Sequence, residues 1–143
     1  VLMPGVIPQV MQVAVLNSIL GKAGGVTFPL SLRLFSNDIT PGVTDTNASY
    51  TQVTGGGYAA VSIANGADFT VSAGNPSEAE YVDFIDFDFT GTTGGSGKVF
   101  GYFLLDANNV LCGAQRGSAP TGITIANGSQ VKVLPIIKAG NVD

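Results

Sequence analysis

Asp86 and Asp88 are the residues whose type and spacing come closest to those of a chemical site. They stand two apart in the run EYVDFIDFDF, so in a β-strand both carboxylates point to the same side, because alternate side chains share a face. Two such carboxylates can act as acid and base on a glycoside or can bind a divalent cation. The interleaved Phe87 and Phe89 instead favour the polar face of a half-buried strand, so we expect solvated carboxylates and no bound metal.

Three further motifs carry less specific signals. Glu78, Glu80 and Asp83 form an acidic group that we interpret as the charged surface of a strand. Asn47-Ala48-Ser49 and Asn127-Gly128-Ser129 match the glycosylation sequon, which is meaningful only in a secreted protein.

The sequence does not predict a nucleophilic side chain that is activated by a neighbouring base. The chain has no histidine, which removes the usual general base at neutral pH. Its single cysteine, Cys112, lies in the run NVLCGAQR, and we expect it to be a small apolar residue inside a strand. The sequence also lacks nucleophile-elbow and phosphate-loop motifs. We therefore predict no enzymatic activity and no cofactor.

The first 25 residues are predicted to form an N-terminal helix or arm. In the run PQVMQVAVLNSIL, apolar residues recur at spacings of three and four, with Pro8 at the start and Gly21 at the end. The segment is apolar nearly all round, which favours burial on more than one side, against this domain or another subunit. The residues that we predict to form an assembly interface are Val6, Ile7, Val10, Val13, Leu16 and Leu20.

Residues 26–143 are predicted to form a β-sandwich domain. Phe28, Leu30, Leu32 and Leu34 alternate with other residues in FPLSLRLF, which is the side-chain period of a strand. Seven more predicted strands are Tyr58–Ala64, Phe69–Ala73, Tyr81–Phe89, Val99–Leu105, Val110–Gln115, Gly122–Ala126 and Gln130–Ile137, and Tyr50–Val53 is a shorter candidate.

Turn signals between these strands complete the predicted fold. Asn65-Gly66 and Asn127-Gly128 are dipeptides typical of hairpin turns. The phase of the apolar residues changes within Tyr81–Phe89, which we interpret as a β-bulge near Phe84-Ile85. Many short strands separated by turns predict an all-β fold, a jelly-roll-like antiparallel β-sandwich with a short N-terminal helix or arm.

Composition narrows the possible partners. Of 143 residues only 11% are charged while 45% are hydrophobic, and six Lys and Arg are scattered among ten Asp and Glu. A nucleic-acid binder needs cations that converge on one face, so no nucleic-acid partner is expected. Polar residues and prolines interrupt the N-terminal apolar stretch, so we expect no transmembrane helix and no membrane partner.

Four segments together carry a resemblance to a known family: Met3 to Leu20, Leu32 to Ile63, Lys98 to Arg116, and the closing strand QVKVLPII. The chain resembles a family of small structural proteins of tailed bacteriophages, the capsid cement or decoration proteins. The resemblance implies a β-sandwich or jelly-roll subunit, commonly a homotrimer. It also implies a place on the outer capsid surface of the virion, where the protein bridges neighbouring major capsid proteins and stabilises the shell.

Low charge is consistent with that expectation, because a protein that works by assembly must bury apolar surface. The principal alternative is a tail-fibre module that binds a host receptor or a carbohydrate. Such a module would use an exposed aromatic platform, for which the chain offers Tyr50, Tyr58, Tyr81 and Tyr102 but no tryptophan. A third possibility, a glycoside hydrolase, would need Asp86 and Asp88 to face each other across a cleft.

Overall fold

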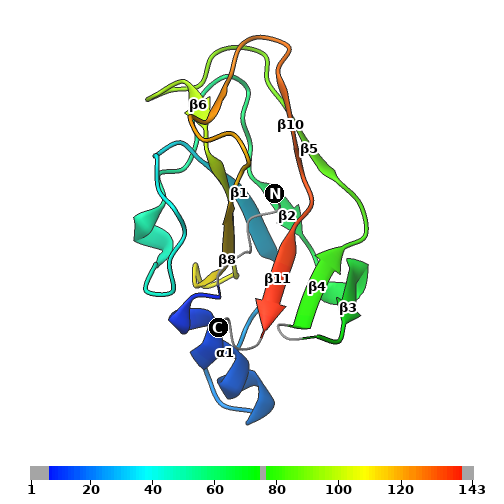
Figure 1. The fold of residues 1–143 in the computed structure, drawn as a ribbon. Helices are drawn as coiled ribbons and strands as arrows, with labels where there is room; N and C mark the ends of the chain where they lie inside the picture. The colour runs from blue at the N-terminus through cyan, green and yellow to red at the C-terminus, as the bar shows by residue number, and fades with distance from the viewer. Residues whose placement is uncertain (1–6, 75–76, 140–143) are drawn as a thin grey trace.

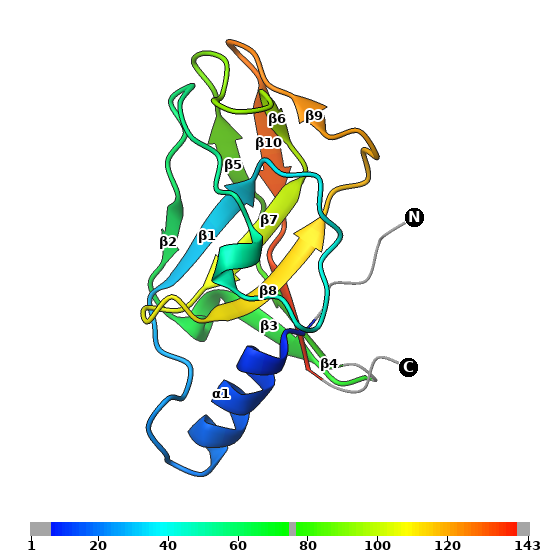
Figure 2. The same cartoon turned by 90° about the vertical axis from the view of Figure 1, so that its left-hand side faces the viewer.

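Antiparallel strands form two facing layers, and one helix lies at the lower end of both (Figures 1 and 2). This computed structural model describes residues 7–74 and 77–139. In chain order the α-helix, the strands and the two short 3₁₀ helices are α1 Gln9–Ile19, β1 Leu30–Phe35, η1 Asn47–Ser49, β2 Val61–Ile63, η2 Gly66–Asp68, β3 Phe69–Ser72, β4 Ser77–Tyr81, β5 Ile85–Asp88, β6 Lys98–Val99, β7 Gly101–Leu105, β8 Leu111–Arg116, β9 Ile123–Thr124, β10 Gln130–Val133 and β11 Ile136–Ala139.

The first layer is a four-stranded sheet with the order β2-β1-β7-β8, which faces the viewer in Figure 2. The second layer contains the pair β10-β5 and the three-stranded sheet β11-β4-β3, and β6 pairs with β9 at the upper end. Every pairing is antiparallel. The predicted antiparallel β-sandwich with a short N-terminal helix is therefore confirmed.

Strand β7 is buried on both faces, which explains its continuous apolar run. In β7, Tyr102 and Leu104 belong to the main core between the two layers. Phe103 and Leu105, on the opposite face, belong to a smaller core with Phe35. Strand β7 therefore contributes side chains to both cores.

Two long predicted strands are each divided in two. The run Tyr81–Phe89 breaks at residues 82–84, so β4 pairs with β11 whereas β5 pairs with β10. The predicted β-bulge near Phe84-Ile85 is therefore wrong: the change of apolar phase marks a break, and Val82 and Phe84 are both exposed there. The run Gln130–Ile137 is divided in the same way, between β10 and β11.

The two Asn-Gly turns join different sheets. Asn65-Gly66 begins η2 between β2 and β3, and Asn127-Gly128 lies in a turn between β9 and β10. Neither dipeptide closes a hairpin, because the strands on its two sides do not pair with each other.

Phe28 was also expected on the buried face of the first strand, but β1 begins only at Leu30 and Phe28 is exposed.

Candidate functional site

Helix α1 is held to the sandwich by one of its faces. Ile7, Met11 and Ala14 are buried, and Ile7 and Met11 belong to the main core. The backbone N–H of Gln9 donates to the carbonyl oxygen of Val43 at 2.9 Å, which fixes the start of the helix. The helix also packs against β8. The apolar residues on this side of the N-terminal run therefore pack into the core of the chain.

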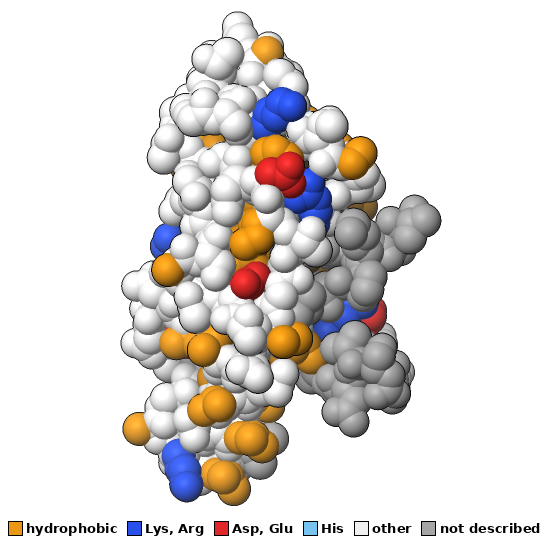
Figure 3. All heavy atoms as spheres, turned by 60° about the vertical axis from the view of Figure 1, so that its left-hand side comes forward, with side chains coloured by type: hydrophobic (Ala, Val, Ile, Leu, Met, Phe, Trp, Pro, Cys, Tyr) orange, Lys and Arg blue, Asp and Glu red, His pale blue; other side chains and the backbone are white. Residues whose placement is uncertain are grey.

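The exposed side of α1 carries a stripe of apolar residues that has no partner among the described residues. Val10, Val13 and Leu16 of α1, with Leu20 at its C-terminal cap, follow one another at spacings of three and four, so they form one stripe. Their exposed fractions are 37%, 58%, 58% and 63%, respectively. Figure 3 shows hydrophobic side chains gathered at this lower end of the molecule. We name these four residues the α1 face.

A groove continues the α1 face onto the sandwich. Its volume is about 670 Å³, and Val10 and Val13 line one side. The other side comes from η1 and from residues 109–111 at the turn into β8. Helix α1 contains no charged residue. The face and the groove therefore form one uncharged and mostly apolar surface.

The predicted interface residues are divided by the structure. Val10, Val13, Leu16 and Leu20 form the α1 face, whereas Ile7 lies in the core at 5% exposure. Val6 lies outside the described residues. The spacing of the apolar residues indicated a helix, but spacing alone could not say which of its sides packs on the sandwich.

A second apolar cavity, of about 330 Å³, lies between the end of β8 and the segment from β10 to β11. Leu34, Val99 and Tyr102 are among the residues that line it. Phe84 and Ile123, which also line it, are exposed. Sequence reasoning missed this cavity, because it depends on the division of the second layer into separate strand pairs.

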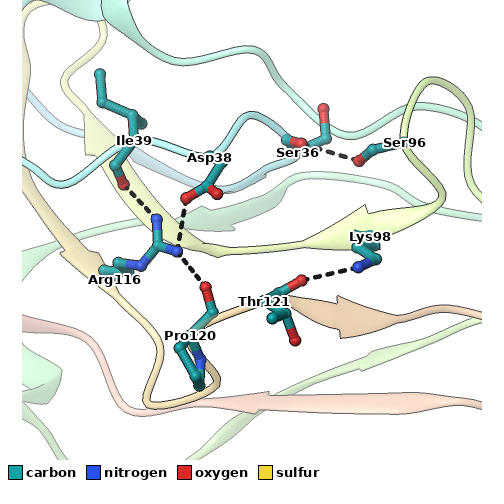
Figure 4. Close-up of polar contacts among 8 residues, drawn as sticks. All are labelled: Ser36, Asp38, Ile39, Ser96, Lys98, Arg116, Pro120 and Thr121. Atoms are coloured by element: carbon teal, nitrogen blue, oxygen red, sulfur yellow. Dashed lines mark hydrogen bonds and ion pairs between the residues drawn. The ribbon is translucent and has the colours of Figure 1, made fainter.

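Arg116 uses its guanidinium group to hold two loops together (Figure 4). It forms a 2.6 Å ion pair with Asp38, and it donates hydrogen bonds to the carbonyl oxygens of Ile39 at 3.0 Å and Pro120 at 2.7 Å. Its charged carbon lies 5.1 Å from the centre of the Phe100 ring. These contacts make Arg116 a structural residue, and sequence reasoning had not distinguished it from the other cations.

Asp86 and Asp88 lie on the exposed face of β5, as expected. Each meets a residue of β10: Lys132 lies 3.4 Å from Asp86, and the Gln130 side-chain amide donates to Asp88 at 2.7 Å. Within residues 7–74 and 77–139, no three His, Cys, Asp or Glu side chains lie close enough together to hold a metal ion. Both carboxylates therefore have partners across the β5–β10 ladder: Asp86 faces an opposite charge and Asp88 a neutral amide.

Glu78 and Cys112, two further candidate groups, both contribute to the fold. Glu78 forms a 2.7 Å ion pair with Lys138 across the β4–β11 ladder. Cys112 is buried in β8, as expected. Burial raises the pKa of the Cys112 thiol to about 12, and the nearby charge of Asp106 acts in the same direction. The thiol is therefore protonated at neutral pH and is not prepared for nucleophilic attack.

The four tyrosines do not share an exposed platform. Tyr50 and Tyr102 are buried, and the Tyr50 hydroxyl donates to Asp45 at 2.7 Å. Burial, and then the bond to Asp45, raise the pKa of Tyr50 well above its ordinary value. Tyr58 is half-buried and stacks on Phe87, while Tyr81 is half-buried against Phe69.

Asp106 is a buried carboxylate that sequence reasoning missed. It lies at the end of β7, where its two oxygens accept hydrogen bonds from the backbone N–H groups of Thr27, Asn108 and Val110. The Thr27 hydroxyl donates to it as well. The signal was the run Asp-Ala-Asn-Asn between two apolar runs, which is typical of an aspartate that binds its own turn. Asp106 therefore fixes the turn that borders the groove.

Comparison with known proteins gives no match: no family model, no characterised protein and no solved structure is similar to this chain. Among the described residues, no helix has both the length and the apolar character to cross a membrane.

Proposed function

We propose that this chain is a structural virion protein, a capsid decoration or cement protein of a tailed bacteriophage. It acts as a homotrimer that binds the outer surface of the capsid and bridges major capsid proteins. The α1 face is the observation that carries this proposal. Soluble monomers rarely expose large contiguous apolar patches, and such patches mark interaction sites.

The energetics of the α1 face favour burial in an assembly. Complete burial of one valine or leucine side chain contributes about 1.5–3 kcal/mol. Helix α1 has no charged side chain whose hydration would be lost in a contact. Stable interfaces bury about 800 Å² on each partner, which is more than a stripe of four side chains provides. The contact therefore extends from the α1 face into the adjoining groove.

The sequence resemblance supports a phage capsid as the partner that the α1 face contacts. The β-sandwich agrees with the fold that the resemblance implies, and a charge-poor chain suits a protein that works by burying surface. The alternative, a tail-fibre module that binds a receptor or a carbohydrate, has weaker support because the tyrosines are packed within the fold.

The test is to locate the chain in purified phage particles that encode it. Cryo-electron microscopy should show trimeric density on the outer shell, with α1 at a contact between subunits or with the capsid. Density at the tail tip alone would support the alternative function and overturn this proposal. Absence of the chain from purified particles would also overturn it.

A further inference from the structure

The two Asn-Gly pairs of the chain share the potential for one chemical modification. In deamidation, the backbone nitrogen of the glycine attacks the side-chain carbonyl carbon of the asparagine. A carbon–nitrogen bond forms, ammonia leaves, and the resulting five-membered imide is opened by water to aspartate or isoaspartate. Glycine favours the reaction because it has no side chain to obstruct the approach. Asn65 and Asn127 are both exposed, so solvent reaches both sites.

The structure protects the pair Asn127-Gly128. The attacking group would be the Gly128 nitrogen, but its N–H donates to the carbonyl oxygen of Phe89 at 2.8 Å. Ser129 fixes the same turn, because its hydroxyl accepts from the Ala126 N–H at 3.0 Å and its own N–H donates to the Ala126 carbonyl oxygen. Attack therefore requires the loss of a backbone hydrogen bond and movement of a turn that is held at several points.

The pair Asn65-Gly66 has the opposite arrangement. Gly66 is the first residue of η2, and the first N–H groups of a helix have no acceptor within it. Among the described residues, no other group accepts a hydrogen bond from this N–H. The nucleophilic nitrogen of Gly66 is therefore free of the restraint that holds Gly128.

The side chain of Asn65 is also activated. Its Oδ1 atom accepts a hydrogen bond from the Ala67 N–H at 2.8 Å. This turn holds the side-chain carbonyl group of Asn65 on the same side as the backbone N–H groups that follow it. The same bond withdraws electrons from the carbonyl carbon and stabilises the negative charge that develops on Oδ1 during attack.

We propose that Asn65 is a deamidation site of the folded protein, whereas Asn127 is protected. The product places a new negative charge at the start of η2, which already contains Asp68. Isoaspartate also lengthens the backbone by one methylene group, in the link between β2 of the first layer and β3 of the second. The modification therefore acts where the two layers are joined, and it does not depend on the proposed function.

The test is peptide mapping by mass spectrometry after incubation of the full chain at mildly alkaline pH. In the folded protein, the peptide with Asn65 should exchange its amide for a carboxyl group about fivefold faster than the peptide with Asn127, or more, since one hydrogen bond separates them. In urea the two rates should converge, because unfolding removes both turns. Equal rates in the folded protein, or faster reaction at Asn127, would overturn the proposal.

Two variants separate the chemistry from general mobility. Gly66→Ala should slow the reaction at Asn65, because the new methyl group obstructs the attack. The position has room for it, since the nearest atom is in the Phe28 ring at 3.4 Å. Ser129→Ala removes the hydroxyl that fixes the other turn and should raise the rate at Asn127 alone. A Gly66→Ala variant that reacts at the original rate would contradict the proposed attack.

Discussion

Several charged side chains among the described residues stabilise the fold through hydrogen bonds and ion pairs. Arg116 binds two loops, and Asp106 binds the backbone of the turn that follows it. Asp86 forms an ion pair with Lys132 across the β5–β10 ladder. Cys112 contributes to the core, and its burial suppresses the thiolate that would make it reactive. We therefore expect changes to these groups to alter the stability of the fold and not a reaction.

Cys112 should resist a disulfide-exchange reagent at neutral pH until the protein unfolds. Its pKa is raised from 9.0 to about 12 in the folded state. Above pH 9 the unfolded thiol therefore loses its proton while the folded thiol keeps it, so stability falls as pH rises from about 9 to 12. Urea unfolding across this range should show a smaller fall for Cys112→Ala. Rapid labelling of the folded chain at pH 7 would contradict this prediction.

The double variant Asp86→Asn, Asp88→Asn should keep its stability to within about 1 kcal/mol, because exposed ion pairs contribute little. Thermal melting with and without calcium measures this directly. We expect no shift with calcium in either protein. If calcium stabilised the natural sequence but not the double variant, the two carboxylates would bind a cation.

Among the secondary-structure elements, α1 packs one face on the core, while its other face has no partner in the part of the chain that the structure describes. Met11→Ala should lower stability by about 2–5 kcal/mol at every protein concentration, because it leaves a cavity in the core. Leu16→Ala should be nearly neutral in dilute solution and should lower the melting temperature only where the protein assembles. Melting curves over a concentration series measure both effects. Concentration-independent loss at Leu16 would place that side chain in the core.

The turn between β7 and β8 depends on one buried carboxylate. Asp106→Ala should cost about 3 kcal/mol or more, because it leaves the backbone N–H groups of Asn108 and Val110 without an acceptor. Asp106→Asn, which retains one oxygen, should cost less. Denaturant unfolding gives the comparison, and equal stability of all three proteins would show that water replaces the carboxylate.

The sequence predicted those helices and strands that show a regular spacing of apolar residues within one short segment. Alternation of Leu30, Leu32 and Leu34 indicated β1, and the spacing of apolar residues indicated α1. The breaks at residues 82–84 and before β11 were not predictable, because they arise where one chain segment passes from one strand partner to the next. The α1 face was predicted in part, but burial of Ile7 depends on tertiary packing that spacing does not reveal.

For the molecule as a whole, the account requires that this β-sandwich assembles through the α1 face. Light scattering at micromolar concentration, coupled to size exclusion, tests this on the full chain. The matched variants are Leu16→Glu on the α1 face and Val71→Glu on β3, where Val71 is also exposed, at 74%. We predict a trimer or another closed oligomer for the natural sequence and for Val71→Glu, and a folded monomer for Leu16→Glu. A natural sequence that stays monomeric at every concentration, or a Leu16→Glu variant that assembles normally, would contradict the account.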